Sequence, residues 1–173
     1  LCNIGIAMAQ NHSKVLLVDA DMRNPRLNEV FKKENKEGLS AYLSRQRVGL
    51  ASLIQKTEIE NLYLITSGSN PPNPSELLAS PRLCDFIDEA KKEFDFILFD
   101  TPPIAILTDA AILSGCADGV VMVVESGKTP KKILDRISKI FIETKAKVIG
   151  IILNKLSADS SDYYYYSYYP PQC

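Results

Sequence analysis

Continuous runs of apolar residues recur along the chain and predict buried β-strands. Each run is short and rich in branched side chains, and it lacks the alternation of polar and apolar residues that marks a half-exposed strand. The runs cover residues 15–18, 62–66, 95–99, 119–125 and 147–153. We therefore expect strands that are buried on both faces, as in a parallel sheet.

Segments with apolar residues at helical spacing lie between these runs. Ser80-Pro81 and Thr129-Pro130 stand where two predicted helices begin, because Ser and Thr cap a first turn and Pro fits one. The spaced apolar residues are Ile4, Ala7 and Met8, then Leu39 to Tyr42, then Leu83, Phe86, Ile87 and Ala90, and lastly Ile133, Leu134, Ile137, Ile140 and Phe141. Strands that alternate with amphipathic helices predict right-handed βαβ units in a doubly wound, mainly parallel α/β fold.

The composition is that of one globular domain followed by an unusual tail. The chain has 173 residues, of which 46% are hydrophobic and 24% charged, enough for a sizeable core. Its last segment is crowded with tyrosines, which cannot all find core positions. We therefore predict a globular domain over residues 1–156 and a flexible, tyrosine-rich tail over residues 157–173.

Charge and cysteine usage argue against several classes of function. The net charge of -1 gives no basic field for nucleic acid, and the basic residues of segment 128–139 are typical of a solvated helix face. Four widely spaced cysteines and one histidine indicate a reduced, cytoplasmic chain without a cysteine metal site. No apolar run approaches the roughly 20 residues that span a bilayer. Any membrane link is therefore expected to come through a partner or a further segment.

Carboxylates stand at the ends of two predicted strands. Asp19 and Asp21 follow the first apolar run, in VLLVDADMR, and Asp100 follows the third, in FILFDTPP. The carboxyl ends of parallel strands share one edge of a sheet, and ligands bind there. Asp also caps helices, but acids at the ends of two strands suit a hard cation and the phosphates that it bridges. We favour Mg²⁺ with a nucleotide over helix caps.

These residues carry a resemblance to a known family. DADMR at residues 19–23, FILFDTPP at residues 96–103 and SGSNPPNPSELL at residues 67–78 resemble the cytoplasmic kinase domain of the bacterial tyrosine autokinases. The resemblance runs over essentially the whole chain. It implies a P-loop NTPase fold and an ATP-dependent protein-tyrosine kinase that phosphorylates itself and regulates capsule and exopolysaccharide synthesis.

The resemblance also implies roles for individual residues. Asp19, Asp21 and Arg23 fall on the Walker A′ motif, and Asp100 falls on Walker B. We expect Asp19 and Asp21 to share proton acceptance and metal contact, with Asp100 as a further Mg²⁺ contact. Arg23 is expected at the nucleotide, and the alternatives are that it stabilises the acids or serves an interface. Asn154, in IILNK, matches the position where related ATPases contact adenine, while a polar residue that ends a strand is an equal alternative.

The tail is implied to be the kinase's own substrate. Its phosphoacceptors are expected to be Tyr163, Tyr164, Tyr165, Tyr166, Tyr168 and Tyr169. The last strand should end near Asn154, at the edge where Asp19 and Asp100 stand, and residues 155–163 could extend about 30 Å from it. Tyr163 can therefore reach an active site, either its own or a neighbour's.

One motif expected of this fold does not occur in the sequence. Phosphate binding uses G-x-x-x-x-G-K-[ST], and the GK pair at Gly127-Lys128 has Met122 where the earlier glycine is required. LCNIGIAMAQ resembles the helix that directly follows this loop in relatives. The sequence is therefore expected to begin just after the loop and to lack the strand before it, and we expect the 173 residues alone to bind ATP poorly.

Assembly and regulation are further implications of the resemblance. It implies ring-like homo-oligomers that phosphorylate in trans, a transmembrane modulator or fused membrane segment, an opposing protein tyrosine phosphatase, and a cytoplasmic position at the inner face of the membrane. Nucleic acid is not expected as a partner. Two other classes stay open: a partitioning or division-site ATPase, which predicts a basic or amphipathic C-terminal element, and a P-loop-less, non-catalytic fragment that acts as a substrate or assembly subunit.

Overall fold

The computed structural model describes residues 1–44 and 48–156, and the chain divides into two compact units, Leu1–Cys116 and Ala117–Cys173. The helices of the first unit are α1 (Cys2–Gln10), α2 (Leu27–Val30), α3 (Leu39–Ser44), α4 (Leu50–Leu53), α5 (Pro74–Leu78), α6 (Pro81–Ala90) and α7 (Asp109–Ser114). Its strands are β1 (Val15–Asp19), β2 (Gln55–Lys56), β3 (Leu62–Ile65) and β4 (Phe96–Asp100). The second unit contains β5 (Val120–Glu125), α8 (Lys131–Glu143) and β6 (Val148–Asn154).

The sheet of the first unit is mainly parallel, with the strand order β2-β3-β1-β4. β1 lies between β3 and β4 and is parallel to both, while the short β2 is antiparallel to β3. The chain passes from β1 to β3 on one side and later to β4 on the other, so the strand order reverses at β1. Ligands of open α/β sheets bind at such a reversal, beyond the carboxyl ends of the strands.

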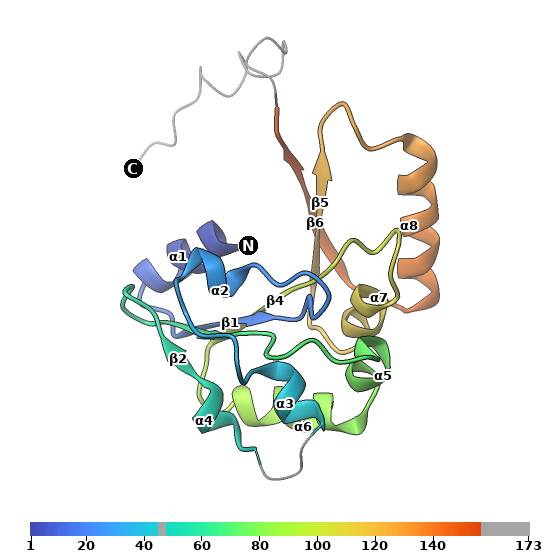
Figure 1. Ribbon diagram of the computed structural model, residues 1–173. Coiled ribbons are helices and arrows are strands. Elements are labelled where there is room, and N and C mark those ends of the chain that lie inside the picture. The colour runs from blue at the N-terminus through green and yellow to red at the C-terminus, as the bar shows by residue number, and fades with distance from the viewer. Residues whose placement is uncertain (45–47, 157–173) are drawn as a thin grey trace. The chain divides into compact units, whose positions relative to one another are not determined.

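Alternate residues of β1 face two separate apolar cores. Leu16 and Val18 belong to the larger core, together with buried residues of α3, α4 and α6. Val15 and Leu17 belong to a smaller core, together with buried residues of α1 and α2. Figure 1 shows α1 and α2 on one side of β1, and α3 and α6 on the other. Helices therefore cover both faces of the sheet, and the predicted doubly wound α/β fold is confirmed.

Burial on both faces is confirmed for the central strands and is wrong for the others. All residues of β1 and most of β3 are buried. β4 has no fully buried residue, and Phe96 is 42% exposed. β5 and β6 form a parallel pair within the second unit, where the described buried apolar residues are Val124, Ile137 and Phe141. In the described parts of the chain, β4, β5 and β6 each pair with a single strand.

The helices predicted from apolar spacing are present as α1, α3, α6 and α8. Ser80 is the N-cap of α6 and Pro81 its first residue, but the Ser80 hydroxyl donates to the carbonyl oxygen of Leu77 at 2.7 Å instead of capping the first turn. Helices α2, α4, α5 and α7, of four to six residues, were not predicted, because they are too short to show a helical period. Among the described helices, none has the length and apolarity needed to cross a bilayer.

Candidate functional site

Asp19 ends β1 with a fully buried carboxylate. The chain then turns and enters α2, and the backbone at the start of this helix faces the strand end. Oδ2 of Asp19 accepts hydrogen bonds from the backbone N–H groups of Arg26, at 3.0 Å, and Leu27, at 2.9 Å. These two bonds fix the carboxylate at the carboxyl edge of the sheet.

The second oxygen of Asp19 has no hydrogen-bond partner among the described residues. Burial raises the pKa of Asp19, the two backbone bonds oppose this effect, and the charge of Asp100 raises the pKa further. A buried carboxylate oxygen without a donor is costly unless it is protonated or bound to a cation. Asp19 is therefore suited to take up a proton or to ligate a metal through Oδ1.

Asp100 ends the neighbouring strand beside Asp19. The two residues are register partners in the parallel pair of β1 and β4, and the N–H of Ala20 donates to the carbonyl oxygen of Asp100 at 2.8 Å. Burial raises the pKa of Asp100, and the charge of Asp21 raises it further. The structure thus brings together the three aspartates that the sequence analysis singled out.

The acid cluster of Asp19, Asp21 and Asp100 fits a magnesium ion that is coordinated largely by water and phosphate. Within residues 1–44 and 48–156, no group of three or more His, Cys, Asp and Glu side chains is arranged as a metal site. Mg²⁺ usually binds through one or two carboxylates and keeps its remaining positions for water and substrate phosphates. Asp19, through Oδ1, and the neighbouring Asp100 can supply these one or two carboxylates.

The N-terminal end of α1 lies near the same acids. Burial raises the pKa of the thiol of Cys2, the first residue of α1, and the charges of Asp100 and Asp19 raise it further. The N-terminus of a helix carries partial positive charge and free N–H groups, which favour phosphate. This edge of the sheet therefore combines acids for a cation with a helix end for an anion, as a metal-bound nucleotide requires.

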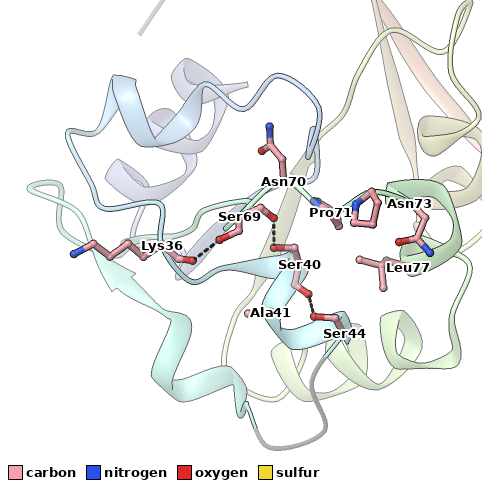
Figure 2. A pocket seen from close by; sticks show the side chains of 10 residues that line it. Lys36, Ser40, Ala41, Ser44, Ser69, Asn70, Pro71, Asn73 and Leu77 are labelled. Atoms are coloured by element: carbon pink, nitrogen blue, oxygen red, sulfur yellow. Dashed lines mark hydrogen bonds between the residues drawn. The ribbon is translucent and has the colours of Figure 1, made fainter.

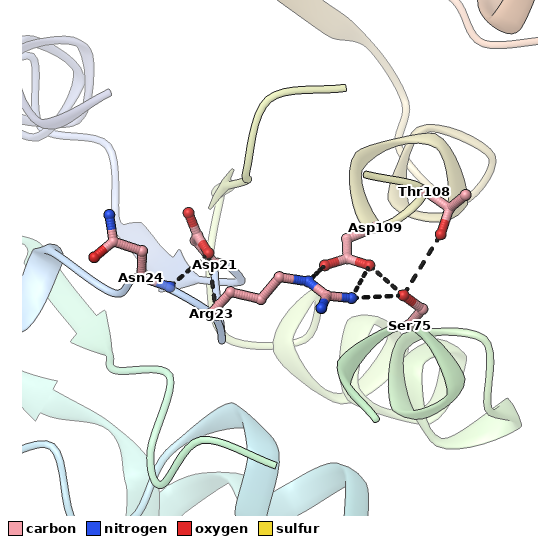
Figure 3. A network of polar contacts seen from close by, with 6 residues as sticks. All are labelled: Asp21, Arg23, Asn24, Ser75, Thr108 and Asp109. Atoms are coloured by element: carbon pink, nitrogen blue, oxygen red, sulfur yellow. Dashed lines mark hydrogen bonds and ion pairs between the residues drawn. The ribbon is translucent and has the colours of Figure 1, made fainter. Parts of the chain in front are cut away.

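Arg23 extends to a buried carboxylate outside the acid cluster, as Figure 3 shows. Its Nε donates to Oδ2 of Asp109 at 2.9 Å, and its Nη2 donates to Ser75 Oγ at 3.0 Å. Asp109 is fully buried, whereas the Arg23 side chain is 38% exposed. Sequence reasoning missed Asp109 and Ser75, because an Asp before an apolar run is typical of a helix start and gives no sign of a distant arginine.

Asn154 ends β6 in the second unit. It is exposed, and its Oδ1 accepts a hydrogen bond from the N–H of Lys155 at 2.9 Å. The acid cluster belongs to the first unit, so the adenine contact of Asn154 stays a prediction. The predicted phosphoacceptors, Tyr163 to Tyr166, Tyr168 and Tyr169, lie outside the described residues.

A pocket in the first unit is separate from the acid cluster. It is lined by residues of the segments 36–44 and 69–77, and none of the three aspartates is among them. Figure 2 shows that the hydroxyls of its serines, Ser40, Ser44 and Ser69, bond to the pocket's own backbone. Ser40 Oγ donates to the carbonyl oxygen of Ser69 at 2.8 Å, and Ser44 Oγ donates to that of Ser40 at 2.6 Å. The serine hydroxyls are thus engaged within the pocket itself, and none of the predicted site residues lines it.

Asp109 should make stability depend on pH in the acid range. Although burial opposes the effect, hydrogen bonds from Arg23 and Ser75 lower the pKa of Asp109. Its ionised form therefore stabilises the fold above the ordinary Asp pKa of about 3.9, and this contribution is lost as the pH falls through the lower value of the folded state. In urea unfolding, the wild type should be more stable than Asp109→Asn at pH 7, by a margin that shrinks below about pH 4.

The matched control for this titration is Asp88→Asn, which changes an exposed aspartate of α6. The free energy of unfolding of this variant should stay close to the wild-type value over the whole pH range. A margin between wild type and Asp109→Asn that is the same at pH 3 as at pH 7 would contradict the assignment of the ion pair.

Comparison with known proteins first assigns the class. A family model described as an AAA domain matches residues 1–149. Together with the doubly wound sheet and its acid-ended strands, this match defines a P-loop NTPase-like α/β protein. The septum site-determining protein MinD from Pyrococcus horikoshii, complexed with Mg-ADP, shares the fold with a TM-score of 0.72 at 21% identity, over 91% of this chain and 64% of that one.

Closer matches assign the family. The kinase domain of the Escherichia coli tyrosine kinase ETK gives a TM-score of 0.85 at 30% identity, over 91% of this chain and 61% of that one. Tyrosine-protein kinase YwqD of Bacillus subtilis (strain 168) is 39% identical over 165 residues, which are 95% of this chain and 69% of that protein. The chain belongs to the bacterial tyrosine kinase family, and the resemblance drawn from its acid motifs is confirmed.

Proposed function

We propose that the protein is an ATP-dependent tyrosine autokinase that transfers the γ-phosphate of Mg·ATP to its own C-terminal tyrosines. The observation that carries the proposal is the buried, unpartnered Oδ1 of Asp19 beside Asp100, at the strand-order reversal of a chain in the tyrosine kinase family. The proposed acceptors are Tyr163, Tyr164, Tyr165, Tyr166, Tyr168 and Tyr169.

The acid cluster suits the proton transfer that this reaction needs. A phenol has a pKa of about 10 and is neutral at pH 7. As its oxygen bonds to the γ-phosphorus and the bond to the departing ADP oxygen breaks, its proton passes to a carboxylate of Asp19 or Asp21. A carboxylate with a raised pKa, such as Asp19, is a better proton acceptor than an ordinary one. Mg²⁺, when bound through Asp19 and Asp100, neutralises charge on the phosphates.

The remaining parts of the proposal rest on family membership. They are an adenine contact by Asn154, ring-like homo-oligomers that phosphorylate in trans, and a transmembrane modulator or fused membrane segment at the inner face of the membrane. A protein tyrosine phosphatase would reverse the reaction, and the regulated process would be capsule or exopolysaccharide synthesis. Each phosphotyrosine adds about 1.5 to 2 negative charges, so a fully modified tail would repel acidic neighbours and favour disassembly.

The proposal is tested by incubating the full-length protein with Mg·ATP and measuring tail phosphate by mass spectrometry. Wild type is compared with Asp100→Ala and with a variant in which all six tail tyrosines are phenylalanine. We expect phosphate on the wild-type tail, none on the phenylalanine variant, and a loss of about 100-fold or more in rate for Asp100→Ala. Equal phosphorylation with and without Asp100 would overturn the proposal.

A further inference from the structure

Arg23 joins the loops that follow β1 and β4, the two strands that end in Asp19 and Asp100. It lies two residues after Asp21, in the loop that follows β1, whereas Asp109 closes the loop that follows Asp100 and begins α7. The guanidinium contacts both oxygens of Asp109, with Nε to Oδ2 at 2.9 Å and Nη2 to Oδ1 at 3.3 Å. Two-point contacts of this kind fix direction as well as distance.

Ser75 ties a third element to this pair. Its hydroxyl, at the start of α5, donates to Oδ1 of Asp109 and accepts from Nη2 of Arg23 at 3.0 Å. The hydroxyl of Thr108 is within 3.5 Å of Ser75 Oγ, as Figure 3 shows. The buried Asp109 carboxylate thus receives hydrogen bonds from two elements other than its own, which keeps it ionised and holds it in place.

The backbone of Arg23 also orients Asp21. Oδ1 of Asp21 accepts hydrogen bonds from the N–H of Arg23, at 3.1 Å, and from the N–H of Asn24, at 2.9 Å. These bonds form an Asx turn, which sets the plane of the Asp21 carboxylate. The side chain of Arg23 is thus tied to Asp109 and its backbone to Asp21, an acid of the cluster.

We propose that Arg23, Asp109 and Ser75 form a loop clamp that sets the spacing of Asp21 and Asp100 for Mg²⁺ and phosphate. In this role Arg23 is a positioning residue, because its Nε and Nη2 are directed at Asp109 and Ser75. The inference rests on the proposed kinase function of the acid cluster. It gives a role to Ser75, which lies in the SGSNPPNPSELL segment, and to Asp109, which lies outside the quoted motifs.

The clamp is tested by measuring tail phosphorylation against free Mg²⁺ in full-length protein, at saturating ATP and well below the melting temperature. Groups that orient metal ligands typically change metal affinity or activity by about 10- to 100-fold when removed. We expect Arg23→Gln and Asp109→Asn to raise the half-saturating Mg²⁺ concentration by about 10-fold each, with a matching fall in the maximal rate. Arg23→Lys keeps the positive charge but cannot make the two-point contact with Asp109. Its half-saturating Mg²⁺ concentration should therefore lie between those of the two variants and the wild type.

Three comparisons separate the clamp from other roles. If Arg23 binds nucleotide directly, a second titration that varies ATP at saturating Mg²⁺ gives a raised KM for ATP in Arg23→Gln and not in Asp109→Asn, and the clamp is rejected. If the network is only structural, both variants melt at lower temperature with unchanged Mg²⁺ dependence, which also rejects it. If Asp100→Ala leaves phosphorylation unchanged, the proposed function itself fails.

The matched control for lost charge is Lys36→Gln. Lys36 lies in the same unit, pairs with Glu34 at 3.4 Å, and its side chain is 84% exposed. We expect wild-type Mg²⁺ dependence for this variant, since an exposed ion pair positions nothing at the acid cluster. In a double-mutant cycle, Arg23→Gln and Asp109→Asn together should raise the half-saturating Mg²⁺ concentration little more than either change alone. Additive effects of the two changes would contradict a shared role.

Discussion

Asp19→Asn is expected to lower tail phosphorylation by about 100-fold or more, because it removes a proton acceptor and a metal ligand together. The same change should make the protein more stable at neutral pH. The pKa of Asp19 is raised by burial, so the folded state binds the proton more tightly than the unfolded chain, and wild-type stability falls as the pH rises through the folded value. Asparagine never ionises, and its side-chain oxygen can still accept from the N–H groups of Arg26 and Leu27.

The measurement is urea unfolding of both proteins between pH 3 and pH 8, paired with the phosphorylation assay. The stability gained by Asp19→Asn should be largest at pH 8 and should vanish below about pH 3.9, where Asp19 is protonated in both states of the wild type. The exposed Asp88→Asn serves as the control for a lost carboxylate. An Asp19→Asn variant that is less stable than wild type at pH 8 would show that the ionised carboxylate supports the fold.

Gly38→Ala is expected to have the largest effect on stability. A Cβ at this position would stand 2.0 Å from the carbonyl oxygen of Thr66 and 2.4 Å from the backbone nitrogen of Gly68. Both are backbone atoms that cannot rotate away, since the N–H of Leu39 donates to Thr66 at 2.8 Å and that of Ser40 to Ser67 at 2.9 Å. We expect a loss of about 3 kcal/mol or more, which for a chain of this size lowers the melting temperature by about 6–12 °C.

The control is Gly49→Ala, which lies in the same unit with no atom within 4 Å of the added Cβ. Its melting temperature should fall by a few degrees at most, because Gly49 has an ordinary φ of -89° and its role is to precede the four-residue α4 as N-cap, where Ala is only moderately less favourable. Thermal unfolding followed by circular dichroism suffices for both variants. Similar melting temperatures for Gly38→Ala and wild type would mean that the segments 38–40 and 66–68 are not held together as described.

The three aspartates came together as a local pattern predicts. Asp19 and Asp100 each follow an apolar run, and parallel strands place their carboxyl ends on one edge, while the strand order, with β4 next to β1, makes the two residues neighbours. Arg23 could not be assigned in this way. Its partner Asp109 is 86 residues away in the sequence and looks like an ordinary helix start, so no local pattern predicts their contact.

The sequence by itself determined the class of fold, the edge of the sheet where the acids stand and the family to which the chain belongs. The fold class and the edge follow from short-range patterns, namely apolar runs, helical spacing and acids at strand ends, and the family follows from the resemblance of three motifs to the bacterial tyrosine kinases. Only the tertiary structure decided that one oxygen of Asp19 is left without a partner, that Asp109 holds Arg23, and that Gly38 lies against Thr66. Those features depend on which distant segments pack together, and packing is settled by the fit of whole elements rather than by the residues next to each site.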